Sequence, residues 1–184
     1  MAHSPSLLTR VLLVPLGALM FATGLAWAAE TPAAPEPIRI RAGASAAHTD
    51  EAGVKWLPDQ GFDDGDMMER PGLDIGNTKT PSVYWAEHFS MTKFRQKLPN
   101  GNYTVKLHFA VTYEAIAQAG EVVFSFNVEG RDYKDFDIWA KAGGARQAYI
   151  ETVPVTIKDG QLDITFTTQK ENPTISAIEI LPRP

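Results

Sequence analysis

Apolar and polar residues alternate with a period of two along much of this chain. The clearest stretch is 103–110, where large apolar side chains at odd positions are separated by polar or small ones at even positions. The same alternation marks 38–41, 122–128, 153–157 and 162–166, and a further apolar run occupies 175–180. A period of two is typical of strands that bury one face. Many short strands separated by turn residues predict an all-β fold, an antiparallel sandwich or barrel.

Turn residues between these stretches indicate how the strands are joined. Glu129-Gly130 and Asp159-Gly160 each stand between two such stretches, so we expect a hairpin at both positions. Pro154 has no N–H to donate, which places its strand at a sheet edge. Residues 113–119 have room for a turn or two of helix at most. Two long, weakly patterned stretches, 44–82 and 140–147, are expected to be loops, which often carry function.

The first thirty residues form a separate segment. No charged residue occurs from 11 to 29, and Ala26-Trp27-Ala28 ends the apolar run with a small-x-small pattern. This is typical of a signal peptide, which we place at 1–28. An uncleaved membrane anchor is the alternative, because the run is nearly long enough to span a bilayer. A Pro/Ala-rich linker at 29–37 then leads to a single domain at 38–184.

The composition excludes several functions. The chain has 17 Lys and Arg against 22 Asp and Glu, a formal net charge of −5, which argues against a nucleic-acid binder that must neutralise many phosphates. It contains no cysteine, so disulfides, thiolate metal sites and thiol nucleophiles are excluded. Its four histidines show none of the spacings of zinc sites, and His108 falls on the polar face of the 103–110 strand. We expect no metal and no cofactor.

An acidic, glycine-containing stretch at 61–69 raises the question of hydrolytic chemistry. Asp63, Asp64 and Asp66 lie close together in it. A glycosidase needs two carboxylates that face each other across the substrate, and carboxylates adjacent in the sequence seldom do so. The spacing also differs from that of an EF-hand loop. A solvated or cation-binding acidic loop is the simpler interpretation, with a hydrolase as the alternative.

Aromatic residues indicate a different kind of site. Trp85 and Phe89 flank Glu87, and Tyr113-Glu114 follows the 103–110 strand directly. Sugars present apolar C–H faces and a rim of hydroxyls, so a sugar site needs aromatic rings beside carboxylates and amides. The alternative is that these rings belong to the core, since large apolar side chains are usually buried. A second polar loop, Glu171-Asn172, comes before the 175–180 run.

A series of short motifs along the predicted domain is similar to the malectin domain family. In chain order they are Arg41-Ala42-Gly43, Asp59-Gln60-Gly61-Phe62, Tyr84-x-x-Glu87-His88-Phe89, Pro99-Asn100-Gly101-x-Tyr103, Asp135-Phe136-Asp137-Ile138, Ala142-Gly143-Gly144-Ala145 and Asn172-Pro173-x-Ile175-Ser176-Ala177. Each motif is weak alone, but together they cover nearly all of residues 38 to 181. The resemblance implies a jelly-roll-like β-sandwich that binds carbohydrate without hydrolysing it. Animal members of the family recognise an α-linked diglucose on immature N-glycans.

The resemblance also implies a sugar site made of aromatic residues and an acid, on loops at one end of the sandwich. One family tyrosine falls near Met67, a second becomes Phe89, and a third is kept as Tyr113. The aromatic neighbour of that third tyrosine becomes Glu114, and an aspartate before Asn-Pro becomes Glu171. A hydroxyl lost from a buried contact removes about 0.5–1.5 kcal/mol. We therefore expect the fold to carry over better than the diglucose specificity.

These residues predict an exported, periplasmic or secreted, non-catalytic module that binds neutral oligosaccharides, glucose-containing ones among them. The expected site residues are Tyr113, Phe89 and Trp85 as ring platforms, Glu171, Asn172 and Glu114 as hydroxyl partners, and Met67 beside them. The alternative is an envelope protein that kept the sandwich, lost sugar binding and contacts another protein instead.

Overall fold

The computed structural model describes Met1 and residues 35–184. The predicted signal peptide and the linker up to residue 34 lie outside the described residues. Within residues 35–184, no helix is both long and apolar enough to cross a membrane. Pro35, Glu36 and Pro37 are exposed and lead into the first strand.

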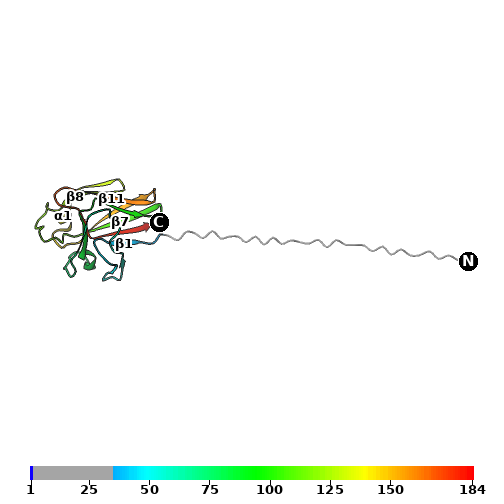
Figure 1. Ribbon diagram of the computed structural model, residues 1–184, viewed down its shortest axis with the longest axis horizontal. Coiled ribbons are helices and arrows are strands. Elements are labelled where there is room, and N and C mark those ends of the chain that lie inside the picture. Colours follow the sequence, from blue (N-terminus) through cyan, green and yellow to red (C-terminus); the bar gives the residue numbers. More distant parts are fainter. Residues whose placement is uncertain (2–34) are drawn as a thin grey trace. The chain divides into compact units, whose positions relative to one another are not determined.

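Two antiparallel sheets of four strands each make up most of the domain (Figure 1). The first sheet has the order β1-β13-β7-β10, with β1 at Ile38–Arg41, β13 at Ala177–Arg183, β7 at Gly101–Phe109 and β10 at Tyr149–Ile157. The second has the order β6-β11-β8-β9, with β6 at Lys93–Lys97, β11 at Gln161–Thr168, β8 at Val123–Val128 and β9 at Arg131–Asp137. In Figure 1, β8 and β11 form one layer and β7 and β1 the other.

Smaller elements are added to this sandwich. A three-stranded sheet has the order β12-β5-β4, with β12 at Thr174–Ile175, β5 at Ala86–Phe89 and β4 at Asp66–Glu69. A two-stranded sheet pairs β2 at His48–Thr49 with β3 at Lys55–Trp56. The helices are a 3-10 helix, η1, at Pro81–Trp85 and a short α-helix, α1, at Ile138–Ala142. The 44–82 stretch expected to be a loop therefore contains three short strands.

The inward side chains of the two large sheets share one main core. At its centre, Phe109 of β7 lies against Phe124 and Phe136 of the opposite sheet, with ring centroids 6.2 and 5.0 Å apart. Tilted aromatic pairs at such distances add about 0.5–1.5 kcal/mol each beyond their burial. The predicted all-β antiparallel sandwich is confirmed.

The turn predictions had mixed outcomes. Glu129 and Gly130 both have positive φ, 50° and 81°, and close the expected hairpin between β8 and β9. Pro154 lies on β10, an edge strand, as expected. The prediction of a hairpin at Asp159-Gly160 was wrong, because the strands on either side of this turn do not pair with each other: β10 pairs with β7, while β11 pairs with β6 and β8. This turn carries the chain from one sheet to the other.

Two further expectations need correction. The 175–180 run is not one strand: it is divided at Ser176 between β12 and β13, which belong to different sheets. Residues 113–119 contain a turn but no helix.

The prediction that His108 lies on a solvent-facing side of its strand was also wrong. His108 is only 5% exposed, because a second small core that includes Trp56 and Tyr84 covers this face of β7. Its Nδ1 pairs with the Tyr84 hydroxyl at 3.0 Å and its Nε2 with Glu179 Oε1 at 3.1 Å. The second core therefore buries the outer face of β7 at His108, whereas Thr104 and Lys106 on the same face remain partly exposed.

Glu179 is the anion at the centre of this polar network. Burial alone would raise the pKa of Glu179, but hydrogen bonds with His108 and Arg39 and the nearby Lys106 ammonium outweigh it and lower the pKa to about 2. Arg39 Nε lies 2.9 Å from the carboxylate. The charge is thus held at neutral pH, and the network ties β1, β7 and β13 together on the outer side of their sheet.

Candidate carbohydrate-binding pocket

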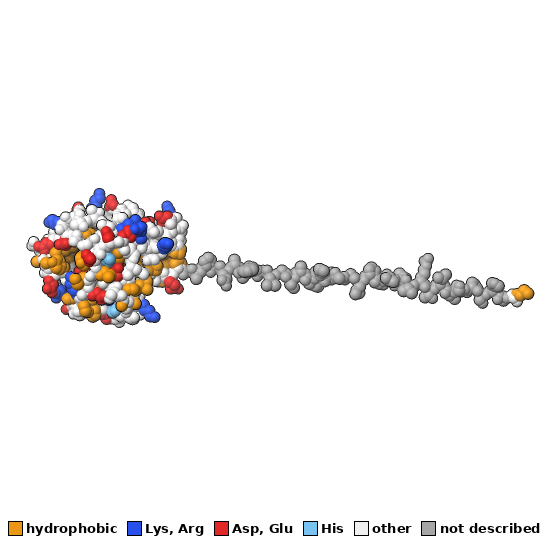
Figure 2. Space-filling view, in the orientation of Figure 1, with side chains coloured by type: hydrophobic (Ala, Val, Ile, Leu, Met, Phe, Trp, Pro, Cys, Tyr) orange, Lys and Arg blue, Asp and Glu red, His pale blue; other side chains and the backbone are white. Residues whose placement is uncertain are grey.

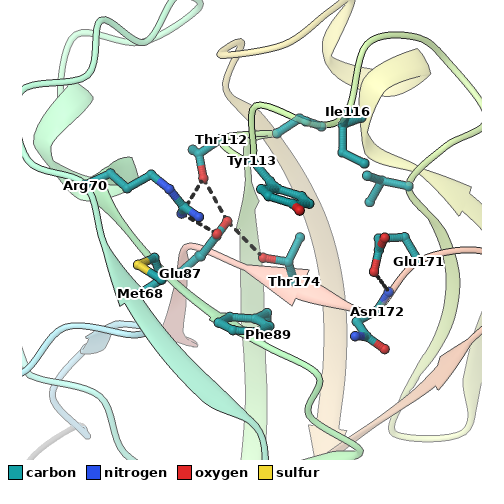
Figure 3. Close-up of a pocket in the computed structure, with 12 residues that line it drawn as sticks. Met68, Arg70, Glu87, Phe89, Thr112, Tyr113, Ile116, Glu171, Asn172 and Thr174 are labelled. Carbon is teal, nitrogen blue, oxygen red and sulfur yellow. Dashed lines mark hydrogen bonds and ion pairs between the residues drawn. The ribbon is translucent and has the colours of Figure 1, made fainter.

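A pocket of about 290 Å³ opens beside the small β12-β5-β4 sheet. Its walls come from β4 and β5, from the segment after β7, and from the loop before β12 (Figure 3). The lining residues are Met68, Arg70, Glu87, Phe89, Val111, Thr112, Tyr113, Ile116, Val122, Glu171, Asn172 and Thr174. Half of them are apolar, and the polar ones gather in two places.

One polar group surrounds the buried carboxylate of Glu87, which is 5% exposed. Arg70 Nη1 donates to Glu87 Oε1 at 2.5 Å and to the Thr112 hydroxyl at 3.2 Å. The Thr112 and Thr174 hydroxyls donate to Glu87 Oε2 at 2.8 and 3.2 Å. Glu87 thus joins three segments of chain, and its charge is balanced by Arg70 and satisfied by hydrogen bonds, as a buried charge requires.

The other polar group is the Glu171-Asn172 loop across the pocket. Glu171 Oε1 accepts a hydrogen bond from the Asn172 backbone N–H at 2.8 Å. Figure 3 shows the rings of Tyr113 and Phe89 on opposite sides of the space between the two polar groups. Tyr113 is 54% exposed, so its ring is accessible to a ligand.

The position of β5 decides which side chains reach the pocket. Successive residues of a strand point to opposite faces, so Glu87 and Phe89 face the pocket and His88 faces away. Met68 lies directly opposite Glu87, and Met67 lies opposite His88. Gly43, with φ of 74°, packs against the backbone of β5 so closely that a Cβ atom would overlap the Glu87 carbonyl oxygen.

His88 fastens the back of β5 to the acidic stretch. Its Nδ1 lies 2.8 Å from Asp59 Oδ2 and its Nε2 lies 2.9 Å from the Asp64 carbonyl oxygen, and its ring stacks on Phe62 at 4.0 Å. Burial alone would lower the pKa of His88, but the hydrogen bonds to Asp59 and Asp64 outweigh it and raise the pKa. Both partners are acceptors, so the geometry matches an imidazolium that donates twice.

The acidic stretch is occupied with structural contacts. Asp64 accepts hydrogen bonds from the Thr92 backbone N–H and hydroxyl, both at 2.7 Å, and the first of these lowers the pKa of Asp64 most. Asp63 pairs with Arg95. No aspartate of this stretch lines the pocket, and the described part of the chain holds no group of three or more His, Cys, Asp or Glu side chains placed to bind a metal.

The structure brings together four of the residues expected at the site and not the other three. Phe89, Tyr113, Glu171 and Asn172 line the pocket. Met67 does not, because it is on the His88 face of β4; Met68 takes that place. Trp85 packs on the second small core and donates its indole N–H to the Leu73 carbonyl at 2.7 Å. Glu114 is exposed and pairs with Arg146 at 3.0 Å.

Sequence reasoning missed the polar floor of the pocket. Arg70, Thr112 and Thr174 lie on segments whose pattern carried no signal for a site. Glu87 did carry one, since it is an acid between aromatic residues in a strand that proves to be buried along most of its length. A charged residue at such a position needs a partner, but the sequence does not say which of many cations supplies it.

The fold is a β-sandwich, and its pocket places two aromatic rings beside a buried carboxylate, Glu87, and a half-buried one, Glu171. The model of the Malectin domain family matches residues 37–178. The chain therefore belongs to the malectin domain family.

Individual relatives support the same family. Malectin-B of Xenopus laevis is 29% identical over 123 residues, which are 57% of this chain and 44% of that protein. A probable LRR receptor-like serine/threonine-protein kinase of Arabidopsis thaliana is 34% identical over 110 residues, 50% of this chain and 11% of that protein. The chain thus spans less than half the length of these curated relatives.

Solved structures show the same fold at low identity. A beta-glucuronidase of Bacteroides uniformis superposes with a TM-score of 0.72 and 17% identity, over 81% of this chain and 18% of that one. The plant receptor-like kinase FER superposes with a TM-score of 0.68 and 20% identity, over 81% of this chain and 42% of that one. The same sandwich fold therefore forms one part of these longer chains.

Proposed function

We propose that the chain is an exported, non-catalytic carbohydrate-binding module, and that its ligand occupies the pocket beside β5. The observation that carries the proposal is the arrangement of Tyr113 and Phe89 on either side of a space that has polar groups at both ends. Apolar sugar faces pack on aromatic rings while sugar hydroxyls exchange hydrogen bonds with carboxylates, amides and hydroxyls. Family membership supports the same reading.

The size of the pocket favours a short ligand. Its volume of about 290 Å³ is at the lower limit of the range, about 300–1,000 Å³, found for small-molecule sites. We therefore expect one or two sugar rings at the end of a glycan chain to enter, with Glu171 and Asn172 contacting their hydroxyls. A small, partly open site predicts dissociation constants between about a micromolar and a millimolar.

The charges of the pocket favour a neutral sugar. Arg70 and Glu87 balance each other, so Glu171 leaves the lining with one net negative charge. A uronic acid would place its carboxylate close to that charge, which is unfavourable. Figure 2 shows acidic and basic side chains interspersed over the face turned to the viewer, which gives no field of one sign to attract a polyanion.

The pocket favours binding over hydrolysis. Glycoside hydrolysis requires two carboxyl groups placed on either side of the scissile bond. Glu87 is held in an ion pair under two threonine hydroxyls, and this leaves Glu171 as the freer carboxylate of the lining. The matching part is only 18% of the bacterial beta-glucuronidase chain, so the activity in that protein's name does not follow from this fold.

Isothermal titration calorimetry with a panel of α- and β-linked gluco-, galacto- and manno-oligosaccharides tests the proposal. We expect saturable binding of at least one neutral member, weakened about tenfold or more by Tyr113→Ala because an aromatic platform contributes on the order of 1.4 kcal/mol. Ile150→Ala is the matched control, since Ile150 is also a large exposed apolar residue, 43% exposed, but lies outside the pocket.

Two outcomes would contradict the proposal. The absence of binding to every glycan, together with specific retention of one envelope protein, would assign the module to protein binding instead. Release of reducing sugar that depends on Glu171 would make the protein an enzyme.

For export, N-terminal sequencing of protein from the periplasm or medium should give a start at or near Ala29, whereas intact Met1 in membranes would indicate an anchor.

A further inference from the structure

A second hollow lies on the outward face of the sheet β6-β11-β8-β9. Its volume is about 520 Å³, within the range of small-molecule sites, and it shares no residue with the pocket beside β5. The residues that line this groove are Ser125, Phe126, Asn127, Asp132, Lys134, Asp135, Thr165, Thr167 and Gln169. All except Phe126, which is buried, have polar side chains.

The floor of the groove consists of short side chains. Thr165 and Thr167 of β11 lie directly opposite Asn127 and Ser125 of β8, on the face of the sheet that points away from the core. Both threonines are exposed, and neither hydroxyl is hydrogen-bonded to another side chain within residues 35–184. Two rows of hydrogen-bonding groups thus stand about 4.8 Å apart, the spacing of neighbouring strands.

A β-bulge in β9 builds one wall. Between the paired positions Phe124 and Phe126, β8 has one residue where β9 has two, Lys134 and Asp135. Successive residues of a regular strand point to opposite faces, but both of these line the groove, so the bulge redirects a side chain. Asp135 has a φ of 51°, a strained conformation for a residue other than glycine, and such strain is concentrated at functional sites.

The two acids of this wall are held in position with one oxygen each. Gln169 Nε2 donates to Asp135 Oδ1 at 2.7 Å, and Asn127 Nδ2 donates to Asp132 Oδ1 at 2.7 Å. The second oxygen of each carboxylate, and the Lys134 ammonium, have no side-chain partner in the described domain. Acceptors and a donor are therefore oriented and still able to bind a ligand.

The rest of the same sheet face differs from the groove. On β6, Lys93 pairs with Asp163 at 2.9 Å and Arg95 pairs with Asp63. A polar outer face alone is ordinary for an antiparallel sheet, and on the β6 side its charges are neutralised by one another. The hollow, the bulge and the free hydrogen-bonding groups coincide only on the β9 side.

We propose that this groove is a second carbohydrate site, which binds an inner stretch of a neutral, hydroxyl-rich glycan chain. Hydroxyls both donate and accept, so they match the mixture of carboxylate, amide, hydroxyl and ammonium groups on the floor and the wall. The groove lacks an exposed aromatic platform, so its affinity is weaker than that of the pocket, in the millimolar range. Two weak sites on one domain raise the avidity for a long chain.

The test is an NMR titration of the ¹⁵N-labelled Tyr113→Ala variant, in which the pocket is impaired, with maltohexaose, cellohexaose and mannohexaose. We expect the amide signals of Asn127, Thr165 and Thr167 to move with at least one of these probes. Replacing both floor threonines, Thr165→Val and Thr167→Val, should weaken that binding about fivefold, the value of one or two lost hydrogen bonds. Thr152→Val, at an exposed threonine of β10, should change nothing.

The controls separate this proposal from the function proposed above. Valine keeps the shape and strand preference of threonine. Unchanged amide signals outside the groove will show that the variant keeps the fold. Asp132→Asn provides a second variant of the groove. The second site would be overturned if signals moved only around β5 or if no signal moved with any probe. It would also be overturned if the double valine variant gave an unchanged titration. Binding of the wild-type chain at the pocket would stand in each case.

Discussion

The ion pair between Arg70 and Glu87 provides the sharpest test of how the pocket is built. The perturbation is a double-mutant cycle made of Arg70→Met, Glu87→Met and the double variant. The Arg70 and Glu87 side chains are 26% and 7% exposed. Each single change leaves one charge without its partner, whereas the double change removes both charges and keeps similar volumes.

The contacts set the expected magnitudes. Removal of Arg70 leaves a buried carboxylate with only two hydroxyl donors, which should cost about 3–5 kcal/mol of unfolding free energy. Removal of Glu87 leaves a partly solvated cation, so the cost should be smaller, about 2–4 kcal/mol. A pair replaced as a whole by apolar groups is often near neutral. We therefore expect the sum of the unfolding free energies lost in the two single variants to exceed the loss in the double variant by at least about 2 kcal/mol.

Urea denaturation followed by tryptophan fluorescence measures the cycle. The matched control is the pair Arg146–Glu114, with N and O 3.0 Å apart and side chains 44% and 81% exposed. A surface pair of this kind should show a coupling below about 0.5 kcal/mol. If the coupling at Arg70–Glu87 is no larger than at Arg146–Glu114, the reasoning that makes this pair the organising contact of the pocket is refuted.

Three more predictions concern the same scaffold. Gly43→Ala should cost about 3 kcal/mol or more of unfolding free energy, because φ is positive and the added Cβ would overlap the Glu87 carbonyl. The control Gly53→Ala, with φ of 78° and no atom near the added Cβ, should cost about 1 kcal/mol. Thermal melting of both variants is the measurement. The pKa of Glu179 is lowered to about 2 from 4.5, so its carboxylate should stabilise the folded state by about 3 kcal/mol above pH 4.5, and this stabilisation is lost as the pH falls toward 2. If the stability of Glu179→Gln falls as steeply with acid as that of the wild type, the prediction is contradicted. The raised pKa of His88 should give stability that is complete below about pH 6.5 and is lost as the pH rises through the folded-state pKa. The difference between the urea midpoints of the wild type and His88→Asn should therefore become smaller at alkaline pH, and a difference that does not change with pH would contradict this.

The sequence allowed most strands to be predicted but not their partners. A period of two identifies which residues of 103–110 or 162–166 face the core, because the side chains must alternate. It does not say which sheet a strand joins, and both sheets of a sandwich present the same apolar inner face. Asp159-Gly160 therefore looked like a hairpin although it connects two sheets. His108 was misplaced for a related reason, since its covering core comes from residues distant in the sequence.

The pocket was predictable as far as residue types go, and less so in its geometry. Tyr113, Phe89, Glu171 and Asn172 line the pocket; aromatic rings and polar groups at strand ends are typical of sugar sites, and the resemblance to the malectin domain implied the same positions. A displacement of one residue in a strand reverses the face, which is why Met68 and not Met67 lines the pocket. The Arg70–Glu87 pair joins segments with no local pattern, so only the folded chain reveals it.

Residues of the acidic stretch form structural contacts behind β5. Alternation along this strand directs Glu87 and Phe89 into the pocket and His88 to the opposite side, where Asp59 and Asp64 bind the imidazole. Any shift of His88 therefore moves its two neighbours in the pocket. Of the carboxylates that looked like candidates for hydrolysis, Asp63 pairs with Arg95 of β6 and Asp64 accepts hydrogen bonds from Thr92. The strand β4, although exposed along its whole length, is paired with β5 at the edge of the small sheet.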